Sequence, residues 1–439
     1  MTSYSGLSFY GLEHIVLVFF ALTLATYLFL KKRVFDVFFL AGGSALLFSF
    51  PLLIGAGLAG PPGWPVVDPE PELYLIFSLF YILILFFALL NDVVFSRVFL
   101  EEDKTPCSIV NITMAFAFVA WGLIFLFLIY SHGVGLLFVE KKRDLISSSG
   151  FLLPFFVWLS VVVSVLLFFY GGKWKKAVSF AVILVSLFLG FRVPLVFSFL
   201  VLGLLYGKKY GKVSLLKKFP VLIPAILVAS VLLVSLAKPF YSQFKSGGME
   251  GVEEALSSRG WVDIAFSGME FMRTQYILNE VVLEDYSTDG GHIIRAPLSL
   301  LPVPRGLYTT PSSEFNDLFQ DDLFYGHESG MAYNPFAEFY SAAGMLGIIA
   351  YILILIAGIQ VVALLLRKGG VWSVFWSIVA VLLSFYFHRN SVAVTFGFVR
   401  NVFWPFFIFW FFSAFFYNIL VFRKGGVFVK YNYDRLGLK

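Results

Sequence analysis

Long runs of hydrophobic residues alternate along the chain with short groups of polar and basic residues. A helix needs about 20 apolar residues to cross a hydrocarbon layer about 30 Å thick, and several runs are long enough. Within lipid such runs satisfy their backbone only as helices, since the alternating pattern of a membrane barrel is absent. The sequence therefore predicts an all-α polytopic membrane protein with eleven transmembrane helices, over residues 12–30, 34–57, 73–91, 112–131, 151–170, 177–190, 193–207, 219–238, 338–366, 371–387 and 402–422.

Basic residues beside these spans predict the orientation of the chain. Cytoplasmic loops are enriched in Lys and Arg, and most basic groups fall on one side if the N-terminus is outside. The acidic, proline-rich stretch 60–72 then lies outside, as expected, and Lys141–Arg143 lies outside against the rule. We expect a multi-pass protein of the cell (inner or plasma) membrane, with its N-terminus outside and its C-terminus in the cytoplasm. The cytoplasmic basic groups are 31–33, 173–176, 208–218, 367–368 and 423–424.

Two adjacent apolar segments, 177–190 and 193–207, are each short for a span, and only Phe191 and Arg192 separate them. A single helix over both would be about 45 Å long, because an α-helix rises 1.5 Å per residue. It would also invert the charge pattern on one side. We therefore expect two short helices that meet at a sharp corner, with Arg192 at its apex. Helices interrupted within a membrane often line a substrate site.

The chain divides into three parts around its only long hydrophilic region. An N-terminal bundle of eight spans occupies residues 1–238, a large extracytoplasmic loop occupies 239–337, and three spans with a basic cytoplasmic tail occupy 338–439. The loop contains roughly half of the 27 acidic residues. Structureless loops beyond about 15 residues are usually functional or disordered, so a loop of this length is expected to contribute to function.

Composition agrees with a membrane protein and excludes other classes. Hydrophobic residues make up 59% of the 439 residues and charged residues only 13%, whereas soluble domains carry about 25% charged residues. The net charge of +5 comes from lysines beside hydrophobic spans, which indicates topology and not nucleic-acid binding. The single cysteine, Cys107, excludes an intrachain disulfide. The sequence contains no P-loop, dinucleotide fingerprint or zinc pattern, and no removable signal peptide is expected.

Five arginines near the predicted outer ends of the spans are candidates for binding a diphosphate, because the planar guanidinium fits phosphate. Arg192 is costly among apolar helices and needs an anionic partner, although reaching the interface or pairing with a loop carboxylate also fits. Arg295 and Arg305 lie among prolines in the outer loop and either bind a diphosphate or pair with aspartates there. Arg389 and Arg400 make the short outer turn before the last span basic, with the same alternatives. The aspartates are Asp317, Asp321 and Asp322.

A group that deprotonates a hydroxyl must be an imidazole or a carboxylate within reach of it, and the stretch 326–338 offers His327 and Glu338. Glu338 at the beginning of a helix is also favoured by the helix dipole alone, and His327 also fits as an ordinary solvated histidine. The acidic stretch 312–322 lacks the alternating ligands and central glycine of a calcium loop. No metal and no cofactor are therefore expected.

Three short stretches resemble motifs of the Wzy-type O-antigen and oligosaccharide repeat-unit polymerases, which are related in architecture to O-antigen ligases. LPVPRGLYTTP contains Pro304–Arg305 and resembles the Pro-Arg motif of the large outer loop. GFRVPL, with Arg192, resembles the arginine at the outer corner. NPFAEFYSAAGMLGI resembles the entry to the next helix, with Glu338, Tyr340, Gly344 and Gly347 in register. The chain departs from the family pattern at Leu307–Tyr308, Ser341, Ala342 and Ala343.

The resemblance implies a fold similar to the GT-C type and a metal-independent glycosyltransferase of polysaccharide biosynthesis, acting on the extracytoplasmic face. Such an enzyme polymerises oligosaccharide repeat units carried on a polyprenyl diphosphate such as undecaprenyl diphosphate. The donor and the acceptor are then both lipid-linked oligosaccharides, and a co-polymerase that regulates chain length is a further partner. In this interpretation Arg192 and Arg305 bind the diphosphate, Arg295, Arg389 or Arg400 assists, and Glu338 or His327 acts as the base.

Other functions stay open on the residues alone. A ligase of the same architecture would move the finished glycan to another acceptor, such as lipid A core. A flippase for lipid-linked oligosaccharides would need internal repeats and charges along a central path, and no repeat is evident. A non-catalytic scaffold would keep its activity in cells after Arg192→Ala or Glu338→Gln.

Overall fold

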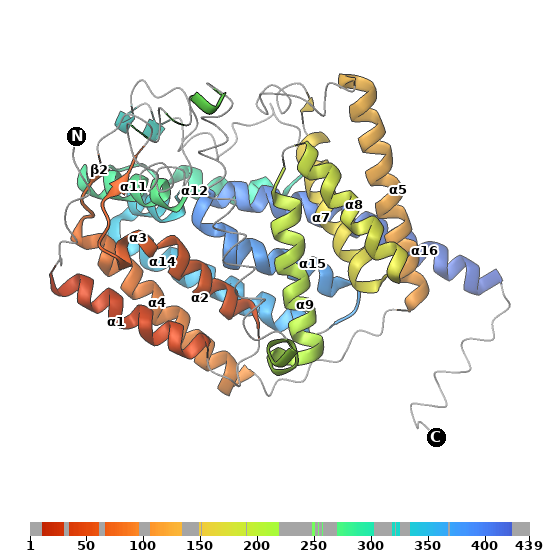
Figure 1. The fold of residues 1–439 in the computed structure, drawn as a ribbon, viewed down its shortest axis with the longest axis horizontal. Coiled ribbons are helices and arrows are strands. Elements are labelled where there is room, and N and C mark those ends of the chain that lie inside the picture. Colours follow the sequence, from red (N-terminus) through yellow and green to blue (C-terminus); the bar gives the residue numbers. More distant parts are fainter. Residues whose placement is uncertain are drawn as a thin grey trace. The chain divides into compact units, whose positions relative to one another are not determined.

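The computed structural model describes residues 11–29, 35–60, 66–95, 106–133, 149–150, 152–189, 191–218, 248–250, 253, 257, 270–302, 318–320, 322–324, 334–367 and 369–423. The elements in these ranges are helices, apart from one antiparallel ladder between the two-residue strands β1 (Leu58–Ala59) and β2 (Val66–Val67). The fold is drawn in Figure 1.

Six segments among the described residues are long and apolar enough to cross a membrane. The prediction of an all-α membrane protein is therefore confirmed at this level. Shorter apolar helices, α1 (Leu12–Leu28), α2 (Val37–Phe48) and the first part of α9 (Val193–Lys218), also coincide with predicted spans. The predicted span 219–238 lies outside the described residues. The six segments are α4 (Pro71–Val93), α5 (Cys107–His132), α7 (Leu152–Tyr170), α14 (Pro335–Arg367), Trp372–Arg389 and most of α16 (Val392–Arg423).

The helical segment predicted over 34–57 is divided into two helices. α2 ends at Phe48, and after Ser49 the short helix α3 (Phe50–Leu53) begins with Pro51 in its first turn. Proline has no N–H, so it cannot continue the hydrogen-bond ladder of the preceding helix. The predicted corner at Arg192 is confirmed: α8 (Lys173–Phe188) ends three residues before it, and α9 begins at Val193.

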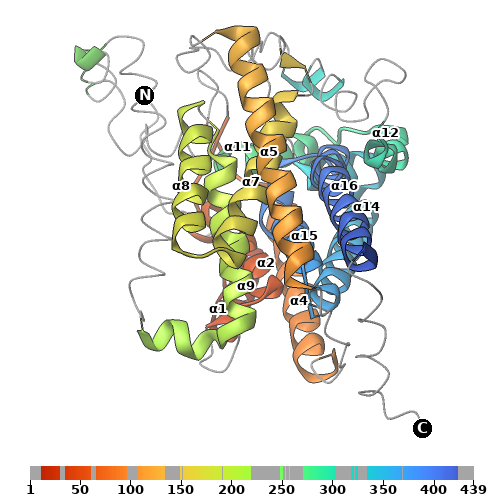
Figure 2. The same ribbon diagram turned by 90° about the vertical axis from the view of Figure 1, so that its right-hand side faces the viewer.

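The chain forms two compact units, each described here by itself. The first comprises Met1–Phe99, Tyr206–Leu364 and Ala380–Gly397. In it, α1 packs against α4 and α2 (Figure 1), and α11 (Glu270–Leu283) packs against β1 and α2. The second comprises Leu100–Leu205, Leu365–Val379 and Phe398–Lys439. In it, α7 packs against both α8 and α5, which Figure 2 shows as neighbouring long helices.

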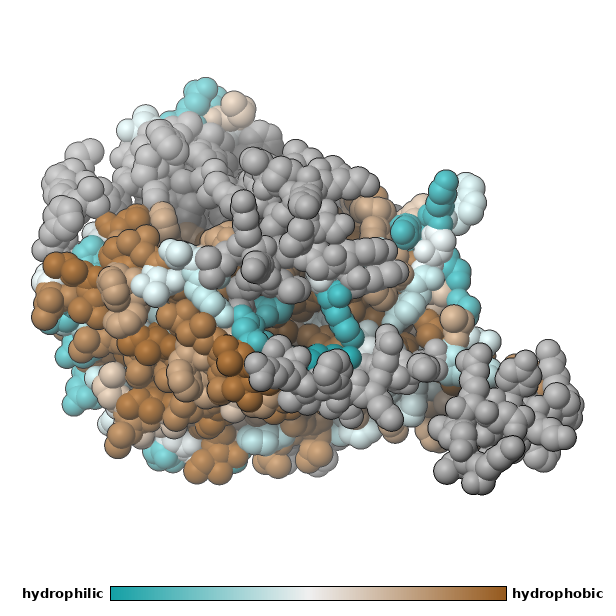
Figure 3. All heavy atoms as spheres, turned by 90° about the horizontal axis from the view of Figure 1, so that it is seen from below, coloured by the Kyte–Doolittle hydropathy of each residue, from teal (hydrophilic) through white to brown (hydrophobic). Residues whose placement is uncertain are grey.

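The two faces of α1 show how the membrane helices divide their apolar residues. Leu17, Ala21, Leu24 and Leu28 are buried, whereas the opposite face exposes its large side chains. Apolar residues on both faces of a helix are expected where one face meets protein and the other meets lipid. Figure 3 shows such apolar side chains over much of the visible surface of the described residues. The exposed residues of α1 are Leu12, Ile15, Phe19 and Leu22.

Two of the membrane segments in the C-terminal part are interrupted. In α14, Ala343 and Gly344 have non-helical backbone angles, so residues 335–342 form a short helix of their own. The next segment changes from α15 (Trp372–Val381) to a π-helical turn, η4 (Leu382–Tyr386), and a 3-10 turn, η5 (Phe387–Arg389). α16 then begins at Val392. The prediction that the last span begins at 402 is wrong by about three turns, and Arg400 lies within the helix instead of in a turn.

Candidate functional site

Glu338 lies in the first turn of α14, as the sequence predicted. Asn334, just before the helix, accepts a hydrogen bond from the backbone N–H of Phe336 and donates one to the carbonyl of Thr274 in α11. An asparagine side chain at this position satisfies a backbone N–H that has no partner within the helix. Asn334 therefore both starts α14 and ties it to α11, which fixes the level at which Glu338 lies.

The short helix of α14 is also tied to the segment before α12 (Gly291–Arg295). The backbone N–H of Thr288 donates to the carbonyl of Ser341 at 2.7 Å, and the two hydroxyls lie 3.1 Å apart. Gly290 adopts a φ of 69°, which favours glycine, and a side chain there would approach Ala342 at 3.2 Å. This close approach brings α12 beside Glu338.

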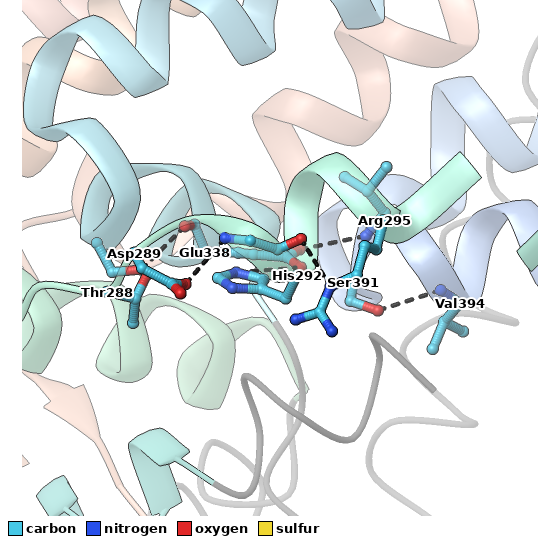
Figure 4. A network of polar contacts seen from close by, with 10 residues as sticks. Thr288, Asp289, His292, Arg295, Glu338, Ser391 and Val394 are labelled. Atoms are coloured by element: carbon cyan, nitrogen blue, oxygen red, sulfur yellow. Dashed lines mark hydrogen bonds and ion pairs between the residues drawn. The ribbon is translucent and has the colours of Figure 1, made fainter. Parts of the chain in front are cut away.

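The result is a buried pair of titratable side chains. His292 in α12 is 1% exposed and Glu338 is 0% exposed, and His292 Nε2 lies 3.7 Å from Glu338 Oε1. The other carboxyl oxygen, Oε2, accepts the backbone N–H of Val392 at 3.2 Å. Figure 4 shows the imidazole and the carboxyl group turned toward each other. Among the described residues, Oε1 of Glu338 makes no hydrogen bond, so its nearest polar neighbour is the imidazole.

The carboxyl group of Glu338 also lies at the positive end of a helix. Ser391 accepts the N–H of Val394 through its hydroxyl at 3.1 Å and so caps α16, and Val392 is the first residue of that helix. The N-terminus of a helix carries partial positive charge and favours a carboxylate. This contact stabilises the ionised form of Glu338 where burial alone would oppose it.

A second histidine, His388, is packed nearby on η5. It is 2% exposed, and its ring stacks on Phe48 at 4.6 Å between ring centroids with an interplanar angle of 13°. Its ring also faces Phe336, two residues before Glu338, at 6.0 Å. Neither ring nitrogen has a hydrogen-bond partner in the described part of the chain. His388 therefore packs as an aromatic side chain here, which a sequence pattern does not reveal.

Two of the predicted arginines belong to the elements that form this site. Arg295 is exposed, three residues after His292 on α12, and its Nε donates to the carbonyl of Gly291 at 3.2 Å. Arg389 is half-buried on η5, two residues before the cap Ser391. Its guanidinium lies over the ring of Tyr386 at 5.7 Å and donates to the hydroxyl of that tyrosine at 3.4 Å. Both contacts leave guanidinium N–H groups for further partners, since arginine has five.

The other predicted residues lie elsewhere. Arg192 is exposed between α8 and α9, in the second unit. Arg400 is half-buried in the part of α16 that belongs to that unit, with its Nε donating to Asn401 at 3.4 Å. His327 and Arg305 lie outside the described residues. In the described part of the chain, no group of three His, Cys, Asp or Glu side chains is arranged to hold a metal.

The sequence did not single out His292, although it identified Arg295 and Glu338. The residues before it, Gly290 and Gly291, mark a turn that begins a short helix. Nothing in the local pattern places this turn against a helix far along the chain. Comparisons of the chain with protein-family models, with curated proteins and with solved structures gave no match. The function therefore has to be argued from the site itself.

Proposed function

We propose that this chain is a membrane glycosyltransferase that polymerises oligosaccharide repeat units carried on a polyprenyl diphosphate, without a metal ion. The observation that carries the proposal is the buried His292–Glu338 pair in the first turn of an interrupted membrane helix, with arginines on two adjoining elements. The proposed location is the cell (inner or plasma) membrane, with the N-terminus outside and the C-terminus in the cytoplasm. A chain-length-regulating co-polymerase is a proposed partner.

In the proposed reaction, a hydroxyl of the acceptor sugar attacks the anomeric carbon of the donor glycan. The new glycosidic bond forms as the bond between the anomeric carbon and the diphosphate oxygen breaks. The hydroxyl proton passes to the His292–Glu338 pair, and the electron pair of the broken bond leaves with the lipid diphosphate. A buried carboxylate beside an imidazole supports this role, because it stabilises the imidazolium that forms when the ring takes a proton.

The leaving group gains negative charge as the bond breaks, and fixed positive charge stabilises it. Arg295 follows His292 on α12, and Arg389 precedes the cap of the helix that binds Glu338. We assign these two arginines to the diphosphate in the first unit. Arg192, Arg305 and Arg400 remain proposed diphosphate ligands on the sequence argument alone, and His327 remains an alternative base.

Both members of the pair are buried, so the acceptor must reach them by displacing α12 from the short helix of α14. Two glycines with positive φ lie where such a displacement would take place: Gly290 before α12 and Gly344 after the short helix. Loops and helix ends that close over a substrate commonly move about a few such positions. Closure would also exclude water, which would otherwise compete with the acceptor hydroxyl for the donor.

The test is the product of the purified protein in lipid nanodiscs, supplied with a single prenyl-diphosphate-linked oligosaccharide from a defined panel. A ladder of lengthening lipid-linked products supports the polymerase. A single transfer to a different lipid acceptor would assign the chain to the ligases. Movement of the substrate across vesicles without any transfer would identify a flippase. Absence of both transfer and movement across the panel contradicts the proposal.

A further inference from the structure

The segment formed by α12 and η3 (Ala296–Leu300) has two different faces. His292, Ala296 and Ser299 are buried, at 1%, 0% and 8% exposure. Ile294, Leu298 and Leu301 follow the same spacing two residues later and are exposed at 81%, 45% and 47%. Residues three and four apart lie on one face of a helix, so the outer face is a continuous apolar row.

Single apolar residues at a surface are ordinary, but this row is not an isolated residue. The inner face carries a histidine, an alanine and a serine, and the outer face carries an isoleucine and two leucines. The more apolar face is therefore the one that is exposed, which reverses the order expected for a segment surrounded by water. The only charged side chain from 293 to 301 is Arg295, which is exposed.

The contacts of α12 fix its level along a membrane helix. His292 meets Glu338, and Thr288 is hydrogen-bonded to Ser341, both in the short first helix of α14. α14 is one of the candidate membrane spans, and beyond its interruption Leu346 and Ile354 are 75% and 65% exposed, as lipid-facing residues are. The first turns of a spanning helix lie at the boundary between headgroups and acyl chains. α12 and η3 therefore lie at this boundary.

We propose that α12 and η3 form a lipid-docking element, which inserts Ile294, Leu298 and Leu301 among the acyl chains of the leaflet at the N-terminal end of α14. Helices of this kind lie in the interface with their apolar face about 5–10 Å below the headgroups. Arg295 then reaches the level of the lipid phosphates, as long cationic side chains do at a membrane surface. The element holds His292 at the depth where the phosphate of a lipid lies. This inference rests on the membrane assignment and not on glycosyl transfer.

The test uses single cysteines labelled with an environment-sensitive fluorophore, in a Cys107→Ser background and in lipid nanodiscs. Ile294→Cys and Leu298→Cys are the probes. Ser287→Cys is the matched control, since Ser287 is exposed four residues before α12. At positions 294 and 298 we expect blue-shifted emission that is quenched by lipids carrying a quencher on the acyl chain. At position 287 we expect emission typical of water, quenched by a soluble quencher.

The proposal is overturned if positions 294 and 298 behave like position 287. It is also overturned if they are protected from both kinds of quencher, because protein would then cover the row. A chain that carries out no glycosyl transfer but shows lipid quenching at both probes would refute the proposed function and leave the lipid-docking element in place.

Discussion

The helices around α7 and the beginning of α14 treat buried polar groups in opposite ways. In the second unit, the hydroxyl of Ser160 donates to the carbonyl of Phe156 and accepts the indole N–H of Trp121 at 2.8 Å. Ser164 and Ser198 share a hydrogen bond at 2.6 Å, and Ser179 donates to the carbonyl of Ser164. In the first unit, by contrast, Glu338 and His292 are buried at a separation of 3.7 Å.

The difference separates polar groups that serve packing from polar groups that are available for chemistry. Small hydroxyls that are fully hydrogen-bonded let membrane helices approach closely and leave nothing over. A buried carboxyl oxygen without a hydrogen bond is unfavourable for stability, and natural structures keep few such groups. The beginning of α14 is also interrupted and depends on a glycine with positive φ, whereas α7 is continuous. Such departures from ideal structure are concentrated at functional sites.

The largest expected effect follows from Glu338→Gln. The amide keeps the shape and still accepts the N–H of Val392, but it removes the charge that would stabilise a protonated His292. General acid–base catalysis typically contributes 10²- to 10⁴-fold, so we expect the rate of glycosyl transfer to fall by about that factor. The rate is measured with purified protein and a lipid-linked donor and acceptor. His292→Gln should reduce it to a similar extent.

The matched control for this change is Glu284→Gln, since Glu284 is exposed at the end of α11. It should transfer at the rate of the unmodified chain. If Glu338→Gln keeps full activity while its thermal unfolding is unchanged, the buried pair is structural and the contrast with α7 loses its functional meaning.

A smaller effect is expected on stability from the glycines of α14. A Cβ added to Gly347 would lie 2.0 Å from the carbonyl oxygen of Phe339, in the backbone of the short helix. Overpacking of this kind typically costs about 1–3 kcal/mol. Gly347→Ala should therefore lower the thermal midpoint in detergent. Gly344→Ala meets no atom within 4 Å but must adopt a φ of 55°, which costs about 1–3 kcal/mol for a residue with a side chain.

Gly358→Ala in the same helix is the control, because its Cβ would meet only Leu383 at an ordinary contact distance of 3.5 Å. Replacing a helical glycine with alanine there should leave stability unchanged or raise it by up to about 1 kcal/mol. Equal effects at all three positions would mean that the interruption of α14 has no special packing.

Ser164→Ala tests the helices around α7 and should have a modest effect. It removes the hydrogen bond to Ser198, and hydrogen bonds between membrane helices contribute about 0.6 kcal/mol on average. Ser186→Ala is the control, since its hydroxyl bonds only to the carbonyl of Val182 in its own helix. Both variants should keep full transferase activity. A loss of activity in Ser164→Ala without unfolding would remove the distinction between the two regions.

The membrane helices were predictable because a long apolar run has few alternatives in lipid. The corner at Arg192 was predictable for the same reason, since the two adjacent runs are too long together for one span. The beginning of α16 was not, because Arg400 was interpreted as a loop residue. A single arginine is compatible with a helix when its guanidinium finds a partner, here Asn401.

The site was predictable only in part. The sequence placed Glu338 in the first turn of a membrane helix and listed Gly344 and Gly347, each of which has a steric or backbone reason at the interruption of α14. It did not place His292 beside Glu338, because that contact depends on the turn at Gly290 and on the bonds between Thr288 and Ser341. Tertiary contacts of this kind leave no periodic signal in the sequence.

The smallest expected effect is on the pH dependence of stability, and it concerns Glu280 of α11, outside the membrane spans. Partial burial raises the pKa of Glu280, and the charge of Glu284 raises it further. A carboxyl whose pKa is higher in the folded state stabilises the fold below its unfolded pKa, and this contribution is lost as the pH rises through the folded pKa. Glu280→Gln removes this dependence, so the variant should gain stability relative to the unmodified chain between about pH 4 and pH 7. Because Glu280 is only partly buried, the gain should be smaller than the effect of Ser164→Ala, and thermal midpoints at the two pH values measure it. An unchanged difference between the two chains at both pH values would show that Glu280 titrates as it does in the unfolded chain.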